Sequence, residues 1–354
     1  MAYRYTDYIH EADQAALEAL KGIPGFTQIL KAFMKEWSER QSRLRNISSY
    51  IRIDENQLPQ YYNLLPPICE KLGIEVPELY LMLDVRPNAF TSGETKPYIV
   101  LTSGLLETLP EELIPTILAH ECGHIACHHV LYRTMGTILI SGTAGSLSRL
   151  PFGALITLPL QVSFFYWMRC SEYSADRAAV LCDGSADKMA EVCMRLAGFD
   201  KNIAGQMNMD AFLEQAKEYR KITLENKWDK TLEFYLLSNA THPLTAVRAL
   251  ECTEWVKTDQ FRQILAGTYI PEKKPAASPK PIIDINEIRR KILHEPEKKE
   301  KICPACGKAN DLDSLFCQNC GHSLSSQIRH CPDCGKELEG DEQFCPHCGK
   351  EIKK

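Results

Sequence analysis

The sequence predicts an α+β fold in which helices are in the majority, with a small sheet and a metal-binding tail. The first observation is a set of helical patterns, which cover residues 11–20, 26–45, 58–72 and most of 116–265. The second is a group of short strand-like runs bounded by proline or glycine, at residues 79–83, 88–91 and 98–101. The third is that eight of the fifteen cysteines fall between residues 303 and 348. This clustering indicates metal binding and not disulfides.

Length and composition exclude several classes of protein. The 354 residues exceed one average domain, so two or three domains with a real core are expected. Hydrophobic residues make up 44% and charged residues 25%, with a net charge of -5, which excludes a disordered or fibrous protein and gives no electrostatic case for wholesale nucleic-acid binding. Acidic residues interrupt the N-terminus where a secretory signal needs an apolar run, so we expect a cytoplasmic location.

Composition divides the chain into three zones. They are a mixed apolar and polar body with N-terminal helices at residues 1–270, a linker at 271–301 and a tail at 302–354. The linker has five prolines and little apolar content apart from one short amphipathic segment. Such a composition is typical of a flexible connection.

The strongest local signal in the body is an HExxH pattern, from His120 to His124, in a predicted helix over residues 116–130. Histidines four residues apart lie one turn apart on one helix face, so both imidazoles can reach a single ion. Glu121 projects beside that ion, where it can take a proton from bound water. Because the pattern can also occur by chance, the position of a third ligand is decisive.

A third ligand on the same helix is not expected. Cys127 and Val130 stand where the extended HExxHxxGxxH pattern requires glycine and histidine. His128 and His129 are predicted to face away from the first two histidines or to lie beyond them, because of the helical geometry.

Glu172 and Asp176 offer the alternative, in a helical segment that follows an apolar stretch. Their i,i+4 spacing places both on one face, so one carboxylate can bind metal while the other accepts the N–H of a ligand imidazole. The competing interpretation is a surface helix with both carboxylates in water, beside Arg169 and Arg177. The HExxH pattern upstream favours the metal site.

Five segments in order along the body resemble the M48 family of zinc metalloendopeptidases, which includes HtpX-like and Ste24-like enzymes. They are Asn88-Ala89-Phe90, then IVLTSGLLETL, EELIPTILAHECGH and SEYSAD, and finally Thr241-His242-Pro243 followed by Arg248. The resemblance implies a mainly helical zincin-type metallopeptidase domain that acts on polypeptides.

The resemblance also implies roles for particular residues. In the family, the residues that match His120, His124 and Glu172 bind zinc, and the one that matches Glu121 is the general base. One departure is Pro115, which removes an amide donor where the family's helix is usually continuous. The helix is therefore expected to begin or bend there, which leaves the ligand turn intact.

Further roles implied by the resemblance lie outside the ligand helices. His242 or Arg248 is expected near the scissile carbonyl, where either could steady the developing oxyanion. Asn88, Ala89 and Phe90 match the family's substrate-side edge strand, on which an extended peptide could pair its backbone.

The reaction that follows is hydrolysis of a peptide bond by zinc-activated water, with no covalent intermediate. A thiol mechanism at Cys122 is a competing interpretation, although this residue lies on another face of the helix. The alternative from a different functional class is a non-catalytic adaptor, in which the tail recruits a partner and the body is a silent scaffold.

The stretch from residue 134 to residue 167 is apolar, with Arg149 as its single charge. Arg149-Leu150-Pro151 divides it into two halves, each shorter than the ~20 residues that usually span a bilayer. We favour buried or groove-lining helices packed over the site. An interfacial or re-entrant hairpin, which would make the protein membrane-associated, is the alternative.

Four CxxC knuckles make up the tail, and the second pair repeats the first. Each knuckle is followed by glycine, which permits the tight turn that sulfur ligation requires. The eight ligands are Cys303, Cys306, Cys317, Cys320, Cys331, Cys334, Cys345 and Cys348. They predict two zinc ribbons with closed, structural sites, and hence about three zinc ions per chain with the catalytic one.

The tail is expected to bind a partner and not to cleave. It has six lysines and arginines against eight aspartates and glutamates, and only Phe316 and Phe344 could stack on bases. Recruitment of a protein or substrate is therefore favoured over nucleic-acid binding.

Overall fold

The computed structural model describes residues 2–271 and positions of the tail between 300 and 348. The gaps in the first range are 24–25, 27–29, 31–32, 34–38, 141–152, 199–203 and 226–243, and in the tail 300–311 is the longest described run. The chain divides into two compact units, Met1–Ile285 and Asn286–Lys354. This boundary falls within the stretch predicted as a linker.

The first unit contains a four-stranded mixed sheet with the order β1-β2-β4-β3. Its strands are β1 (Ile51–Ile53), β2 (Glu78–Met82), β3 (Ala89–Ser92) and β4 (Tyr98–Thr102). β2 and β4 are parallel, and each outer strand is antiparallel to its neighbour. The three predicted strands are present, whereas β1 is too short to show an alternating pattern in the sequence. Among the described strands β3 lies at an edge.

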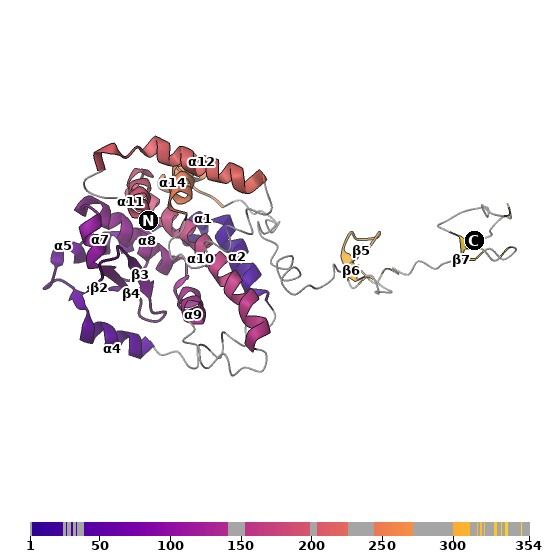
Figure 1. The fold of residues 1–354 in the computed structure, drawn as a ribbon, viewed down its shortest axis with the longest axis horizontal. Coiled ribbons are helices and arrows are strands. Elements are labelled where there is room, and N and C mark those ends of the chain that lie inside the picture. Colours follow the sequence, from indigo (N-terminus) through magenta and orange to yellow (C-terminus); the bar gives the residue numbers. More distant parts are fainter. Residues whose placement is uncertain are drawn as a thin grey trace. The chain divides into compact units, whose positions relative to one another are not determined.

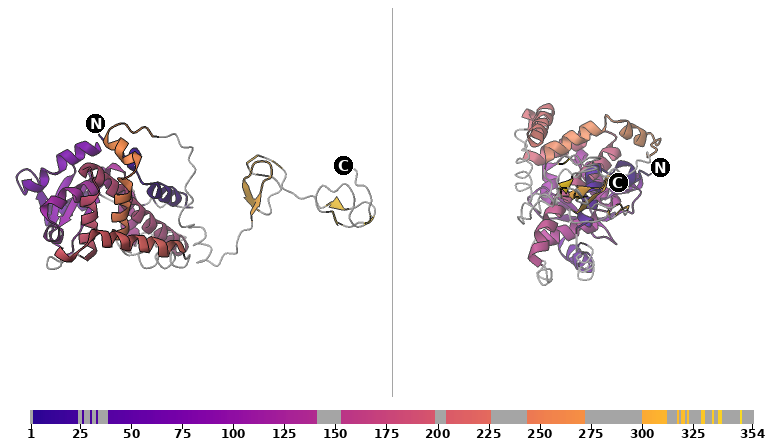
Figure 2. Two further views of the ribbon diagram at one scale, coloured as in Figure 1. Left: turned by 90° about the horizontal axis from the view of Figure 1, so that it is seen from above. Right: turned by 90° about the vertical axis from the view of Figure 1, so that its right-hand side faces the viewer.

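Helices make up most of the rest of the unit, as the sequence predicts (Figures 1 and 2). The helices up to the end of the sheet are α1 (Tyr5–Tyr8), α2 (Glu11–Lys21), α4 (Glu39–Ser49), α5 (Pro59–Tyr62), α6 (Leu65–Leu72) and α7 (Ser103–Thr108). The later ones are α8 (Ile114–Ala126), α9 (Val130–Ile140), α10 (Gly153–Asp183), α11 (Asp187–Gly198), α12 (Met209–Glu225), α14 (Thr245–Trp255) and α15 (Asp259–Leu265). Short 3₁₀ turns precede α8 and α12.

The helix predicted over residues 58–72 is in fact two helices, α5 and α6. Pro66 and Pro67 lie in the first turn of α6, where a missing amide donor is harmless. The same prolines could not lie inside one long helix, because each removes a hydrogen bond and clashes with the preceding turn.

Helix α8, which contains the HExxH pattern, begins at Ile114 with Pro115 in its first turn. The prediction extended it to residue 130, but it ends at Ala126. The reason is His128, which adopts the left-handed conformation with φ 57°. The amide of His129 then donates to the carbonyl of His124, a bond typical of helix C-termini. The chain therefore turns back toward the last turn of α8.

Gly123, between the two motif histidines, allows α8 to lie close against α10. A Cβ at this position would lie 2.7 Å from Cβ of Ala178 and 3.1 Å from the carbonyl oxygen of Ala175. Atoms of a close-packed interior cannot approach to such distances without displacement. The small residues on both helices therefore bring the carboxylates of α10 to the histidines of α8.

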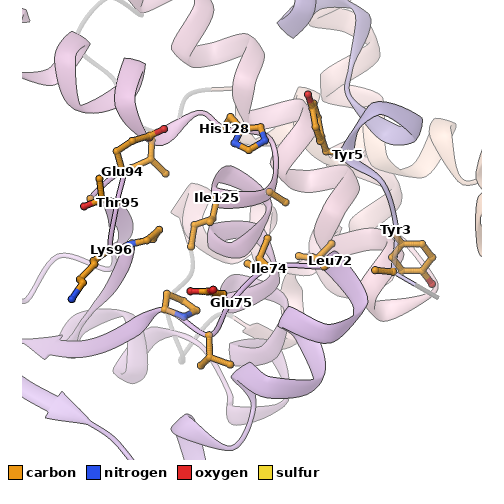
Figure 3. A pocket seen from close by; sticks show the side chains of 18 of the residues that line it. Tyr3, Tyr5, Leu72, Ile74, Glu75, Glu94, Thr95, Lys96, Ile125 and His128 are labelled. Atoms are coloured by element: carbon orange, nitrogen blue, oxygen red, sulfur yellow. The ribbon is translucent and has the colours of Figure 1, made fainter. Parts of the chain in front are cut away.

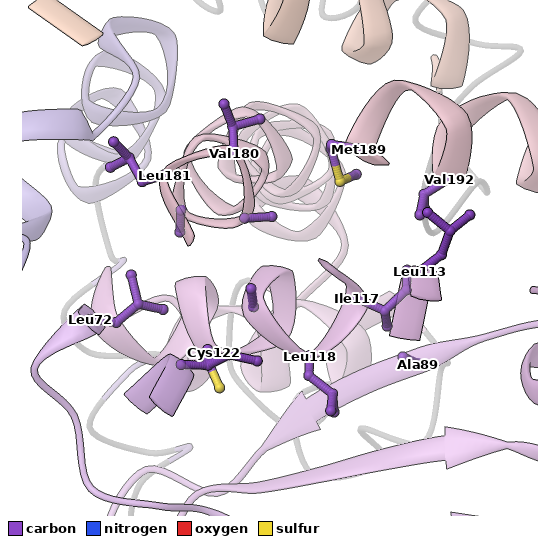
Figure 4. Close-up of a cluster of buried hydrophobic side chains, with 14 of the residues drawn as sticks. Leu72, Ala89, Leu113, Ile117, Leu118, Cys122, Val180, Leu181, Met189 and Val192 are labelled. Atoms are coloured by element: carbon purple, nitrogen blue, oxygen red, sulfur yellow. The ribbon is translucent and has the colours of Figure 1, made fainter. Parts of the chain in front are cut away.

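Helix α8 lies between the sheet and α10 (Figure 4). Leu118 and Cys122 on α8 and Val180 on α10 are fully buried, and they belong to one hydrophobic cluster that also includes residues of α6, α11 and the sheet. Because this core is continuous, it fixes the two helices relative to each other.

A second hydrophobic cluster contains the described ends of the apolar stretch 134–167. Met135 on α9, Phe164 and Trp167 on α10, and Leu20 on α2 are all 0% exposed. These ends are therefore packed inside the unit. Within the described ranges, no helix is both long and apolar enough to cross a bilayer. Arg149, which divides the stretch, lies outside the described residues.

The second unit contains two short antiparallel pairs of strands. β5 (Glu300–Ile302) pairs with β6 (Ala309–Asp311), and β7 (Arg329–His330) pairs with β8 (Glu337–Leu338). β5 begins at Glu300, inside the predicted linker. Gly307, with φ 71°, supplies the left-handed turn between the first two strands.

Candidate metal centre and active site

His120, His124 and Glu172 come together in the interior of the first unit. One ligand atom from each lies within 4.8 Å of the other two. Nε2 of His120 is 3.5 Å from Oε2 of Glu172, and Nε2 of His124 is 3.5 Å from Oε1. All three residues are at most 3% exposed. Two imidazoles and a carboxylate around one point match the donor set of a catalytic zinc site.

Asp176 supports His120 from the side opposite Glu172. Its Oδ1 lies 2.8 Å from Nδ1 of His120, which favours a proton on Nδ1 and a lone pair on Nε2. Burial alone would lower the pKa of His120, but hydrogen bonds with Asp176 and Glu172 raise this pKa to about 9. The two carboxylates therefore favour a positive charge here, and a metal ion bound to Nε2 would take the place of the proton on that nitrogen. The alternative of a solvated surface helix is wrong, because both carboxylates are buried.

His124 suits a metal ligand because its imidazole is buried in the neutral form. Burial lowers the pKa of its imidazole well below the usual value, and the charge of Arg133 acts in the same direction. The ring is therefore neutral, which is the form that binds metal ions. Its Nε2 is buried and lies 3.5 Å from Oε1 of Glu172. A buried ring nitrogen of this kind, with a carboxylate oxygen beside it, suits coordination.

Two arginines bind the carboxylates of the site. Arg248 on α14 donates from Nε and Nη2 to Asp176, at 2.7 and 2.6 Å, and its Nη1 lies 3.1 Å from Oε2 of Glu172. Arg133 on α9 donates to Oε1 of Glu172 at 2.6 Å. Although burial opposes ionisation of Asp176, the charge of Arg248 lowers the pKa of this carboxyl. With His120 on α8, three separate helices therefore contact the carboxylate pair of α10.

Glu121 is held by the edge strand of the sheet. Thr91 on β3 donates from Oγ1 to Oε2 of Glu121 at 2.6 Å, and the same hydroxyl lies 3.3 Å from the Glu121 carbonyl oxygen. The Glu121 residue is 2% exposed. This bond orients a carboxylate that the sequence places next to the first histidine.

A cavity of about 380 Å³ opens beside His120, Glu121 and Arg248. Its apolar wall consists of Leu105, Ile117, Met189, Val192 and Leu196. Asn88 and Ala89 also line it, whereas Phe90 packs near Tyr80 and Tyr98 in a separate cluster. Ala89 and Phe90 are neighbours in β3, so their side chains point to opposite faces of the sheet, whereas Asn88 lies just before the strand.

The larger cavity, of about 910 Å³, lies elsewhere in the unit. It is bordered by the N-terminal segment, the loop after α6 and the β3–β4 turn, with Tyr3 and Lys96 on opposite sides in Figure 3. His128, at the end of α8, reaches it, but none of the predicted site residues lines it. Volume is therefore a poor guide to the chemistry of this protein.

Cys122, the alternative nucleophile, faces the hydrophobic core. It is 0% exposed, and a hydrogen bond with Cys69 together with burial raises the pKa of its thiol well above the usual value. Because the thiolate is the reactive form, the structure argues against a thiol mechanism.

Four cysteines of the tail also converge. The sulfur atoms of Cys303, Cys306, Cys317 and Cys320 lie within 4.8 Å of one another. The two S···S distances across the knuckles are 3.7 Å, from Cys303 to Cys320, and 3.6 Å, from Cys306 to Cys317. A tetrad of this kind is the donor set of a closed structural zinc site.

The structure does not bring all of the predicted site residues together in a described site. His242, Cys331 and Cys345 lie outside the described residues, and Cys334 and Cys348 are described as exposed. The roles predicted for them stay predictions.

Three residues at the site have no signal in the sequence. Thr91, Arg133 and His129 contact Glu121, Glu172 and His124 respectively, yet none belongs to a ligand pattern. His129 is predicted to face away from the two motif histidines or to lie beyond them, and this is wrong because the helix ends before it. Its Nδ1 lies 3.0 Å from Nδ1 of His124.

Comparison with known proteins gives a family match for the body and another for the tail. Residues 65–256 match the model of peptidase family M48, and residues 303–349 match that of the double zinc ribbon. The chain is 35% identical over 266 residues to the plastoglobule-localized metallopeptidase 48, chloroplastic, of Arabidopsis thaliana, covering 73% of this chain and 75% of the relative.

More distant relatives are bacterial. Protease HtpX homologs of Burkholderia lata and Burkholderia cenocepacia are each 23% identical over 259 residues, which is 65% of this chain and 85% of theirs. No solved structure gives a significant match. Because the family match covers more than half of its length, the chain belongs to peptidase family M48 and is a zinc-dependent metallopeptidase that acts on polypeptides.

Proposed function

We propose that His120, His124 and Glu172 hold the catalytic zinc of this metallopeptidase and that Glu121 is its general base. The observation that supports this most directly is the convergence of three ligand atoms within 4.8 Å, from two helices, in a buried site. A bound zinc ion would polarise the scissile carbonyl and acidify a water molecule. The non-catalytic adaptor, our alternative, is disfavoured by membership of a peptidase family.

Glu121 moves the proton in this proposal. Its carboxylate takes a proton from the attacking water and delivers it to the leaving amine. The hydrogen bond from Thr91 to Oε2 holds the carboxylate in place, so that reorientation during the reaction is limited. Thr91 is thus a positioning residue for the general base.

Arg248 is proposed to act on the site through two carboxylates. The resemblance to the family suggested a role at the oxyanion, for Arg248 or for His242. The bonds of Arg248 to Asp176 and its approach to Glu172 support a positioning role. The residue also borders the cavity of about 380 Å³, which we call the cleft. The oxyanion role of His242 stays a proposal, because this residue is not among those described.

The substrate is proposed to lie along β3, in extended form. β3 is at the edge of the described sheet, Asn88 and Ala89 border the cleft, and Thr91 of the same strand reaches Glu121. An edge strand offers backbone donors and acceptors to an extended peptide. The apolar wall of the cleft suits a hydrophobic side chain next to the scissile bond.

The tail is proposed to hold two further zinc ions and to recruit a protein partner. The tetrad of the first ribbon supports one of these ions, and the internal repeat of the sequence supports the other. Its acidic balance disfavours nucleic acid. The cytoplasm stays our prediction for the compartment, because most cysteines are either spaced as metal ligands or buried without a disulfide pattern.

Glu121→Gln in the full-length chain tests the role of the base. We expect cleavage of casein to fall by at least about 100-fold, with unchanged zinc content, because the amide cannot accept the proton. Glu112→Gln, at an exposed glutamate just before α8, is the matched control and should cleave normally. Turnover of the Glu121 variant at the rate of the parent would refute the base. Loss of one zinc ion instead would mean that Glu121 is a ligand.

A further inference from the structure

The imidazole of His124 is supported by residues that no ligand pattern includes. Its Nδ1 lies 3.0 Å from Nδ1 of His129, and Nε2 of His129 lies 2.8 Å from Oδ2 of Asp13 on α2. We call Asp13, His129 and His124 the relay. Its three members are at most 1% exposed. Asp13 lies before residue 65, where the family match begins.

The relay depends on how α8 ends. Because His128 takes the left-handed conformation, the amide of His129 donates to the carbonyl of His124, at 3.0 Å. A longer α8 would have carried His129 beyond the site. The ring of His129 also meets Trp167 edge-on, with centroids 5.7 Å apart. The position of His129 is therefore fixed by both backbone and packing.

Asp13 is a fully buried carboxylate at the far end of the relay. Besides His129, it accepts hydrogen bonds from Nε1 of Trp167 at 2.9 Å and from Oγ of Ser174 at 2.6 Å. Ser174 in turn accepts from the amide of His10. Several donors on one buried carboxylate favour its ionised form. Although burial opposes ionisation, the interaction with His129 and the hydrogen bonds from Ser174 and Trp167 lower the pKa of Asp13.

An ionised Asp13 specifies where the relay protons lie. Its carboxylate only accepts, so Nε2 of His129 must carry a proton. In neutral His129, Nδ1 is then an acceptor, which requires the proton of His124 to lie on Nδ1. Nε2 of His124 is left with its lone pair toward Glu172, as a metal ligand requires.

We propose that Asp13 and His129 are positioning residues that fix the tautomer and orientation of His124 for zinc. This rests on the proposed role of His124 as a ligand. The other ligand histidine, His120, meets its carboxylate directly at Asp176, whereas His124 meets one through a second imidazole. The N-terminal helix α2 thereby becomes part of the catalytic centre.

Two variants of the full-length protein test the relay. In Asp13→Asn the amide can face His129 and reverse its tautomer, and His129→Phe keeps a ring against Trp167 but removes both nitrogens. We expect each to weaken zinc binding in the body by about 10- to 100-fold. Zinc per chain is counted by native mass spectrometry across a series of buffered free-zinc concentrations. The body ion is identified as the one that His124→Ala loses.

Asp183→Asn is the matched control. Asp183 is a carboxylate of α10 that accepts from Thr116 on α8, at 2.8 Å, so the change also weakens a contact to the ligand helix. It should bind zinc as the parent does. The double variant Asp13→Asn/His129→Phe should bind zinc as weakly as His129→Phe alone, because Asp13 acts through His129.

The tautomers themselves can be observed in the unmutated protein. In a long-range ¹H–¹⁵N spectrum of the zinc-loaded chain with ¹⁵N-labelled histidine, assigned with the His129 variant, His129 should be protonated on Nε2 and not on Nδ1. Protonation on Nδ1 would overturn the proposal even if Asp13→Asn fails to fold.

Two further outcomes would also overturn it. One is that Asp13→Asn binds zinc with the affinity of the parent. The other is that the double variant binds zinc more weakly than His129→Phe alone, by the same factor by which Asp13→Asn weakens the parent. If His124→Ala keeps the body zinc, the ligand assignment of the proposed function fails instead. If His124→Ala loses the body zinc while Asp13→Asn binds zinc normally, only the relay proposal fails.

Discussion

The two clusters of potential metal ligands in the described part of the chain are built in opposite ways. In the body, His120, His124 and Glu172 are buried, and a continuous core fixes the helices that hold them. In the tail, Cys303 and Cys317 are buried but Cys306 and Cys320 are exposed, and the described residues beside the tetrad form a short β5–β6 hairpin. The body thus preorganises its site, whereas in the tail the metal must supply much of the folding energy.

This difference matches the work that each site does. A catalytic centre must hold its ligands and its base in a fixed geometry and keep one position for the substrate, which a rigid core allows. A closed sulfur site needs only to keep two knuckles together. We therefore expect the body to tolerate loss of metal and the tail not to.

Removal of the metal tests most directly whether the body keeps its fold without zinc while the tail unfolds. Chelation should abolish cleavage completely, and amide exchange of residues 300–311 should rise to the rate of an unfolded chain. Amides of α8 should stay protected, because the core remains. Hydrogen exchange with mass spectrometry measures both regions in one sample. Equal loss of protection in α8 and the tail would show that the body site is also assembled by its metal.

Arg248→Met should cause the next largest effect. It leaves Asp176 without its bidentate partner in a buried site, so the free energy of unfolding should fall by about 3–5 kcal/mol. Arg220→Met is the matched control, since Arg220 binds Glu251 and Glu254 at a partly exposed site and should cost about 1 kcal/mol or less. Chemical denaturation of the zinc-free proteins compares them. Similar losses would mean that the buried carboxylates do not depend on Arg248.

Gly123→Ala tests whether close helix packing makes the site. The new Cβ would meet Cβ of Ala178 at 2.7 Å, so we expect a loss of about 1–3 kcal/mol in stability, together with reduced zinc affinity. Gly198→Ala is the control, because nothing lies within 4 Å of its Cβ position. Thermal unfolding and zinc titration measure the two effects. Normal zinc affinity in the Gly123 variant would separate helix packing from metal binding.

Thr91→Val should have the smallest effect of these variants, and it tests whether the edge strand positions Glu121. Loss of the hydroxyl bond to Glu121 should lower kcat/KM about tenfold and leave the zinc content unchanged. Ser92→Ala, at the next residue of β3, is the control and should cleave normally. Kinetics on a fluorogenic peptide compare them. A Thr91 variant as active as the Ser92 control would remove Thr91 from the list of positioning residues.

Features that depend on neighbouring residues could be predicted from the sequence, whereas those that depend on distant residues could not. The HExxH helix, the carboxylates of α10 and three strands were predicted, because each depends on the spacing of neighbouring residues. The end of α8 was not, because a left-handed His128 is an unusual helix terminus where glycine is the common one. One such residue brought His129 to the site.

By itself the sequence determined which side chains are available as ligands and how they are spaced, since His120 and His124 share a helix face and the cysteines come in knuckles. Only the tertiary structure decided what surrounds them. Thr91, Arg133, Arg248 and Asp13 reach the site from β3, α9, α14 and α2. The physical reason is that local spacing follows from the helical repeat, whereas contacts between distant segments depend on close packing, here on Gly123 against α10.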